Sequence, residues 1–126
     1  MKKYIYILII LAVLGGIIWL VMTPGTPGKL DDFAKCLGDK GAIFYGAFWC
    51  PHCQAQKALF GKSAKLLPYI ECSTPDGKSQ LPLCVDKNVT NYPTWHFATT
   101  SATPDILTGE IPLETLAEKT GCVLPQ

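Results

Sequence analysis

The sequence predicts a small α/β sandwich preceded by one N-terminal transmembrane helix. Two observations carry this prediction. Residues 4–22 contain no charged side chain, and the rest of the chain alternates helix-like and strand-like segments before closing on two strands and a helix. A chain of 126 residues has room for one domain and a single anchoring or targeting segment. A multidomain enzyme is therefore excluded.

Residues 1–22 predict a retained membrane anchor. Lys2 and Lys3 precede 19 uncharged residues, and a helix of that length covers roughly 30 Å of hydrocarbon, whereas the apolar part of a signal peptide is about 7 to 15 residues long. No small-residue cleavage site follows Met22, which favours an anchor over a cleaved signal. The two lysines predict a cytoplasmic N-terminus and an exoplasmic (periplasmic, extracytoplasmic or lumenal) C-terminal domain.

The remaining chain divides into a linker at residues 23–28, TPGTPG, and a domain at residues 29–126. Eleven lysines against ten acidic residues give a net charge of +1, so the electrostatic footprint of a nucleic-acid-binding protein is missing. All six cysteines lie after residue 28. That density is typical of an oxidising compartment, in which cysteines pair.

Apolar spacing and turn residues predict the elements of the domain. In chain order they are a helix over 30–37 followed by Gly38 and Gly41, a central strand over 42–48, a helix from residue 50, a strand over 69–72, a short helix near 81–85, strands over 94–97 and 105–108, and a helix between Pro112 and Gly121. In the helix from residue 50, the expected inner residues are Cys53, Ala58 and Leu59. The expected outer residues include Gln54, Gln56 and Lys57.

The segment Trp49-Cys50-Pro51-His52-Cys53 sets two thiols three residues apart where a strand passes into a helix. Unpaired N–H groups at a helix N-terminus favour an anion, which would stabilise the Cys50 thiolate. Cys53, one turn further on, can resolve a mixed disulfide. Pro51 suits a first helical turn, and His52 could bring a positive charge or a donor to the thiolate. The motif predicts a redox-active disulfide that needs no metal or other cofactor.

Four segments carry a resemblance to a known family: AIFYGAFWCPHCQAQKALFG at 42–61, YIECS at 69–73, YPTW at 92–95 and TGEIPLETLA at 108–117. Together they resemble the thioredoxin-like domain that accompanies bacterial and plant homologues of vitamin K epoxide reductase. The resemblance implies a three-layer α/β/α thioredoxin-like fold, with Cys50 as nucleophile and Cys53 as resolving thiol. It also implies a cis Pro93 opposite the disulfide. Trp49 is expected to pack beside the disulfide.

The other four cysteines are expected to pair. Cys72 and Cys84 bracket a polar loop, and they form either a structural disulfide or a relay that passes electrons between Cys50-Cys53 and a partner. By elimination, Cys36 and Cys122 then tie the two ends of the domain together.

These patterns predict a membrane-anchored thiol-disulfide oxidoreductase that oxidises exported cysteine-containing proteins. In fused members of the family a bundle of transmembrane helices reduces a quinone, and only one such helix is expected here. The resemblance therefore implies a quinone-reducing membrane partner in trans. Alternatives are an exoplasmic reductase or isomerase, a cytochrome-maturation or copper-delivery thioredoxin, and a zinc-binding or structural module. Zinc normally requires four ligands in two pairs.

Overall fold

The computed structural model describes residues 1–23, 25–99 and 105–126. Its elements are α1 (Lys2–Met22), α2 (Asp31–Asp39), β1 (Ile43–Gly46), α3 (Pro51–Phe60), a 3₁₀ helix η1 (Gly61–Leu66), β2 (Tyr69–Glu71), α4 (Pro82–Asp86), β3 (Thr94–Phe97), β4 (Asp105–Thr108) and α5 (Leu113–Thr120). Pro24 of the predicted linker lies outside the described residues, as does part of the loop between β3 and β4. The helices and strands follow the predicted order.

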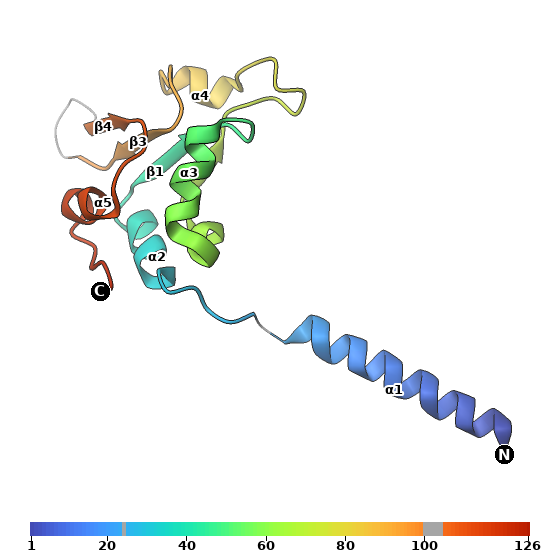
Figure 1. Cartoon of the computed structure of the whole chain (residues 1–126). Helices are drawn as coiled ribbons and strands as arrows, with labels where there is room; N and C mark the ends of the chain where they lie inside the picture. The colour runs from blue at the N-terminus through green and yellow to red at the C-terminus, as the bar shows by residue number, and fades with distance from the viewer. Residues whose placement is uncertain (24, 100–104) are drawn as a thin grey trace.

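One sheet of four strands organises the domain, in the order β2-β1-β3-β4. β1 runs parallel to β2 and antiparallel to β3, and β4 pairs antiparallel with β3. Successive side chains point to opposite faces, so Phe44 joins one core cluster and Tyr45 the other. Helices α2, α3 and α5 cover the first face and α4 covers the second (Figure 1). This is the predicted three-layer α/β/α sandwich.

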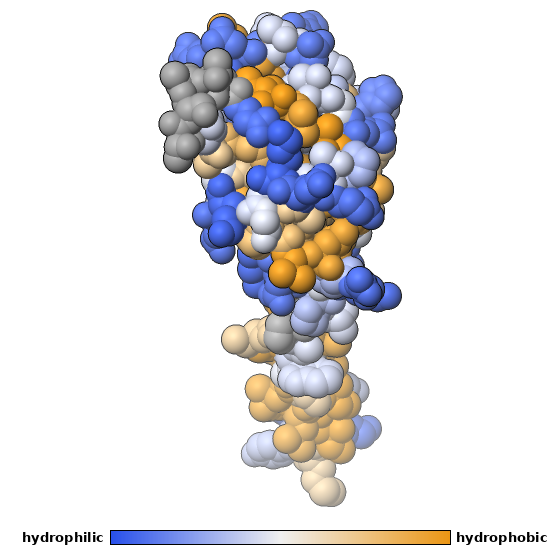
Figure 2. Space-filling model, turned by 90° about the vertical axis from the view of Figure 1, so that its left-hand side faces the viewer, coloured by the Kyte–Doolittle hydropathy of each residue, from blue (hydrophilic) through white to orange (hydrophobic). Residues whose placement is uncertain are grey.

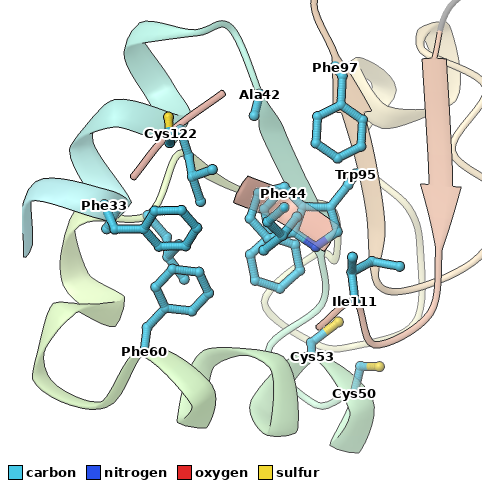
Figure 3. Packing of buried hydrophobic residues seen from close by; sticks show 14 of the residues in the cluster. Phe33, Ala42, Phe44, Cys50, Cys53, Phe60, Trp95, Phe97, Ile111 and Cys122 are labelled. Atoms are coloured by element: carbon cyan, nitrogen blue, oxygen red, sulfur yellow. The ribbon is translucent and has the colours of Figure 1, made fainter. Parts of the chain in front are cut away.

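The larger core is built from aromatic rings contributed by helices and strands. The rings of Phe44 and Trp95 stack with their centroids 4.8 Å apart, and those of Phe33 and Phe60 stack at 5.9 Å. Cys53 belongs to the same cluster, at the end of the core that carries Ile111 (Figure 3). The predicted reactive cysteines therefore lie at the rim of the main core.

Helix α1 stands apart from this domain. None of its 21 residues is buried, and its surface is largely apolar, as the lower part of Figure 2 shows. It is long and apolar enough to cross a membrane.

The linker enters the domain beside η1. The Lys62 ammonium donates a hydrogen bond to the Thr26 hydroxyl at 2.7 Å, and the Leu30 N–H donates to the Ser63 hydroxyl at 3.0 Å. Because η1 follows directly on α3, the chain joins the domain at the C-terminal end of α3. The N-terminal end of α3, which carries Cys50, lies at the far end of the domain (Figure 1).

The predicted inner face of α3 is right at Cys53 and wrong further along the helix. Gln56, expected outside, is fully buried, whereas Ala58 and Leu59, expected inside, are exposed. The buried side chains are Cys53, Gln56 and Phe60, which share one helical face at i, i+3 and i+7. Gln56 can be buried because its amide is hydrogen-bonded to backbone groups of Ile111.

Three smaller expectations also differ from the structure. Gly38, expected beyond the first helix, lies within α2, because the turn that ends the helix comes later, at Gly41 with φ +76°. The predicted strand over 42–48 is shorter, since β1 ends at Gly46 and leaves Phe48 48% exposed. In α4 only Cys84 is buried, and Val85 faces solvent.

Candidate active site

Cys50 and Cys53 occupy the start of α3. Cys50 is the N-cap residue, Pro51 is the first helical residue, and Cys53 follows one turn later. Cys50 is 5% exposed and Cys53 is not exposed at all. Both are free thiols, unlike the other four cysteines. Of the two cysteines, only Cys50 can therefore be reached by another protein.

Gly46 at the end of β1 lets α3 pack this closely on the sheet. A Cβ at this position would lie 2.9 Å from the Cys53 sulfur and 2.9 Å from Cε2 of Tyr69. Both contacts are shorter than side chains tolerate, so the strand needs glycine here.

The loop before β3 reaches the Cys50 sulfur from the other side. The Cys50 Sγ lies 3.7 Å from the Tyr92 carbonyl oxygen, which accepts its weak hydrogen bond. The peptide bond between Tyr92 and Pro93 is cis, and Pro93 is fully buried. The structure thus brings Pro93 next to the cysteine motif, 40 residues further along the chain than Cys53.

Burial changes the pKa of the Cys53 thiol. Loss of solvent raises the pKa of the Cys53 thiol to about 12, against a smaller lowering by a hydrogen bond with the Ala47 backbone. At neutral pH Cys53 is therefore a protonated thiol in the reduced protein. This asymmetry agrees with a reaction that begins at Cys50 and is completed by Cys53.

Aromatic side chains form one wall of the site. The Trp49 indole N–H donates to the Ser73 hydroxyl at 2.8 Å, and its ring meets that of Tyr92 edge-on at 6.1 Å between centroids. Trp49 is 52% exposed. It lies beside the cysteine pair as expected, and the two residues that orient it, Ser73 and Tyr92, were not predicted to do so.

His52 pairs with an acid on the opposite wall. Its Nδ1 lies 2.7 Å from Oε1 of Glu110, and both side chains are exposed. Among the described residues, no hydrogen bond joins His52 to either free thiol. Glu110 was not identified from the sequence, because nothing local to it indicates a partner 58 residues away.

Gln56 holds the segment that carries Glu110. Its side-chain amide donates to the Ile111 carbonyl at 3.0 Å and accepts from the Ile111 N–H at 2.6 Å. His52 and Gln56 are one turn apart on the same face of α3. Together they bind two consecutive residues, Glu110 and Ile111. The sequence gives only a weak signal for these contacts, since a glutamine in an amphipathic helix is normally exposed.

The other cysteines are bonded in the expected pairs. Cys72 and Cys84 are joined with a Cα–Cα distance of 5.6 Å, and Cys36 and Cys122 with one of 5.9 Å. Cys72 and Cys84 are both fully buried, in the core cluster beneath α4. Among residues 1–23, 25–99 and 105–126, no group of three or more metal-ligating side chains is present.

Comparison with known proteins identifies the family. Residues 32–120 match the thioredoxin family. The chain belongs to the thioredoxin family. It is also similar to the thiol-disulfide oxidoreductase LTO1 of Arabidopsis thaliana, with 45% identity over 98 residues. The match covers 74% of this chain and 24% of LTO1, so the chain spans about a quarter of the length of that relative. Both findings support a thiol-disulfide oxidoreductase of thioredoxin type.

Proposed function

We propose that the protein is a membrane-anchored thiol-disulfide oxidoreductase that introduces disulfides into exported proteins through Cys50 and Cys53. The observation that supports this function is the difference in exposure between Cys50 and Cys53. Cys50 caps α3 at the protein surface, and Cys53 is fully buried one turn behind it. Attack from outside is thereby directed to the Cys50 sulfur.

Oxidation of a substrate takes two exchanges. A substrate thiolate attacks the Cys50 sulfur of the oxidised pair, and the electron pair of the broken bond goes to Cys53, which takes up a proton. A second substrate thiolate then attacks the substrate sulfur of the mixed disulfide and releases Cys50 as a thiolate. Cys50 lies at the start of α3, and a helix N-terminus favours negative charge in general, which supports release of oxidised substrate and a reduced pair.

The reduced pair then needs an oxidant. We propose a quinone-reducing membrane protein similar to vitamin K epoxide reductase, which takes two electrons from Cys50 and Cys53 as their disulfide re-forms, while the proton on Cys53 is released. The sequence resemblance supports this partner. Helix α1, lying in the same bilayer, would raise the effective concentration of the domain near such a partner.

One observation favours a second candidate, a reductase or isomerase. A pKa of about 12 makes the Cys53 thiolate a poor leaving group, which slows the opening of the disulfide by a substrate thiolate. The reduction potential decides between the two candidates. The full-length protein in mild detergent is equilibrated with glutathione buffers. A value of about −120 to −180 mV supports the oxidase, and one near −270 mV the reductase.

The exchange reaction itself is tested by trapping. In cells producing Cys53→Ala, Cys50 is expected to accumulate as a mixed disulfide with exported proteins, which reducing agents release. The matched variant Cys50→Ala should trap none. Equal trapping by both variants would show that Cys50 is not the attacking group.

The anchor is tested by fractionation and protease access. The protein is expected to stay in membranes through high-salt and carbonate washes, with its domain cut only from the exoplasmic side. Recovery of a soluble form beginning near Thr23 would mean that α1 is a cleaved signal.

A further inference from the structure

A small cavity lies next to the reactive cysteine. It has a volume of about 210 Å³ and lies between the loop of residues 73–80 and the segment that precedes Pro93. The rings of Trp49 and Tyr92 form its apolar part. Tyr92 also supplies the carbonyl oxygen 3.7 Å from the Cys50 sulfur. A chain that reacts at Cys50 can therefore reach this cavity with a nearby side chain, and the exchange chemistry makes no use of it.

Two hydroxyl groups that line the cavity have a hydrogen left to donate. The Tyr92 hydroxyl accepts a bond from the Gln80 amide at 2.8 Å, which leaves its own O–H to donate outward. The Thr90 hydroxyl accepts a hydrogen bond from the Asn91 amide at 3.3 Å, so its own O–H can also donate to a ligand. Burial raises the pKa of Tyr92, so this hydroxyl keeps its proton. A carboxylate in the cavity can accept these bonds.

Lys78 adds the one positive charge among the residues that line the cavity. Within the described part of the chain, its ammonium has no hydrogen-bond or ion-pair partner. Asp76, in the same loop, makes no ion pair with Lys78 in that part of the chain; its Oδ1 accepts from the Thr74 hydroxyl at 2.5 Å and from the Lys78 backbone N–H at 3.2 Å. The Lys78 charge therefore remains available to a ligand.

Glu71 is the other acid close to this wall. Its Oε1 accepts the backbone N–H groups of Phe48 at 3.2 Å and Ser73 at 2.9 Å, and its Oε2 accepts from the Tyr69 hydroxyl at 2.7 Å. Glu71 therefore supports the base of the loop and does not line the cavity.

The loop is held in shape before any ligand arrives. The Cys72–Cys84 disulfide closes it, Ser73 and Gln80 form a bridge across it, and the Thr74 hydroxyl accepts the Ser79 N–H at 3.1 Å. A preformed loop backbone reduces the entropy that ligand binding costs, and of the proposed donors the exposed Lys78 side chain is the one that binding has to order.

We infer that this cavity binds an acidic side chain, aspartate or glutamate, that lies within a few residues of the reactive cysteine in the protein substrate. The carboxylate would accept bonds from the Tyr92 and Thr90 hydroxyls and pair with the Lys78 ammonium. The inference rests on the proposed function, because it specifies which substrates Cys50 meets. It predicts a preference for cysteines with an acidic neighbour.

The test uses short peptides with one cysteine and one glutamate, moved from four residues before the cysteine to four residues after it. Matched peptides carry glutamine or lysine at the same position. The rate at which each peptide reduces the Cys50–Cys53 disulfide of the full-length protein, in uncharged detergent, is divided by its rate with a small disulfide reagent. This division removes the effect of the neighbour on the thiol itself.

Glutamate is expected to react roughly fivefold faster than glutamine at one or two positions, and lysine more slowly than either, since charge-assisted bonds at a partly exposed site are of moderate strength. Lys78→Gln should abolish the preference for glutamate. The control Lys40→Gln, a lysine exposed at the end of α2, should retain it.

The outcomes separate the inference from the function on which it rests. Equal rates for all three peptides at every position, with exchange still proceeding, would overturn the cavity assignment and leave the oxidoreductase in place. A preference for glutamate that persists in Lys78→Gln would overturn it as well. If no peptide reacts, both the function and the inference fail.

Discussion

The two closely spaced cysteine pairs of this domain differ in bonding and in the exposure of one member. Cys50 and Cys53 are free thiols at the start of a helix, and Cys50 keeps 5% of its surface exposed whereas Cys53 keeps none. Cys72 and Cys84 are bonded to each other and have no exposed surface. A relay needs a sulfur that another sulfur can reach. We therefore expect access to a sulfur atom, more than the spacing of two cysteines, to decide whether the Cys72–Cys84 pair acts as a relay or only as a structural disulfide.

The largest expected effect is on the rate of disulfide exchange and follows from replacing Cys50. Cys50→Ser should reduce disulfide exchange with protein substrates to the background rate, because a hydroxyl forms no mixed disulfide. The measurement is the rate of substrate oxidation by the full-length protein. If Cys50→Ser retained most of the rate, another sulfur would have to be the point of attack, and the contrast between the two pairs would fail.

The next effect is on stability, at the long-range disulfide. Replacing Cys36 and Cys122 together by alanine should lower the free energy of unfolding by about 4.5 kcal/mol, since the bond closes a separation of 86 residues. Denaturant unfolding followed by near-ultraviolet circular dichroism measures it. A loss below about 1 kcal/mol would show that the helices α2 and α5 are held mainly by packing.

The buried pair gives the most direct test of the contrast. Replacing Cys72 and Cys84 by alanine should cost about 3 kcal/mol, because their separation is only 12 residues, and should leave the exchange rate per folded molecule nearly unchanged for peptides without an acidic neighbour. Unfolding curves and peptide kinetics are measured on the same preparation. A lost exchange rate with unchanged stability would restore the relay interpretation.

The smallest effect is a pH dependence of the reduced protein. Burial raises the pKa of the Cys53 thiol from its ordinary value of 9.0 to about 12 in the fold. Between these values the unfolded chain loses the proton and the folded chain keeps it, so stability is complete below about pH 9 and falls as pH rises toward 12. The oxidised protein has no such thiol and should lack this extra loss. Parallel unfolding curves of both forms between about pH 7 and 10.5 should therefore diverge above pH 9.

The order of elements could be predicted because it depends on local patterns. The apolar stretch before Cys50, the turn residues, and the paired Pro112 and Gly121 around α5 each act within a few residues. The exact inner face of α3 could not be predicted. It depends on a hydrogen bond from Gln56 to Ile111, 55 residues later.

The same reason explains which parts of the site were found. The cysteine motif is contiguous, so its position at a helix start is visible in the sequence. Glu110 reaches His52, and Tyr92 reaches Cys50, only after the sheet has brought distant loops together. Such contacts have no local pattern, and the resemblance to a family supplied only Pro93 among them.

The direction of α3 has a consequence for how the protein can be used in a membrane. The linker joins the domain at one end of this helix, and Cys50 stands at the other, about 15 Å away for ten residues at about 1.5 Å each. If α1 spans a bilayer as proposed, this length of helix would separate the reactive sulfur from the point where the linker leaves the membrane. The proposed membrane oxidant would then need cysteines that extend beyond the lipid surface to reach Cys50.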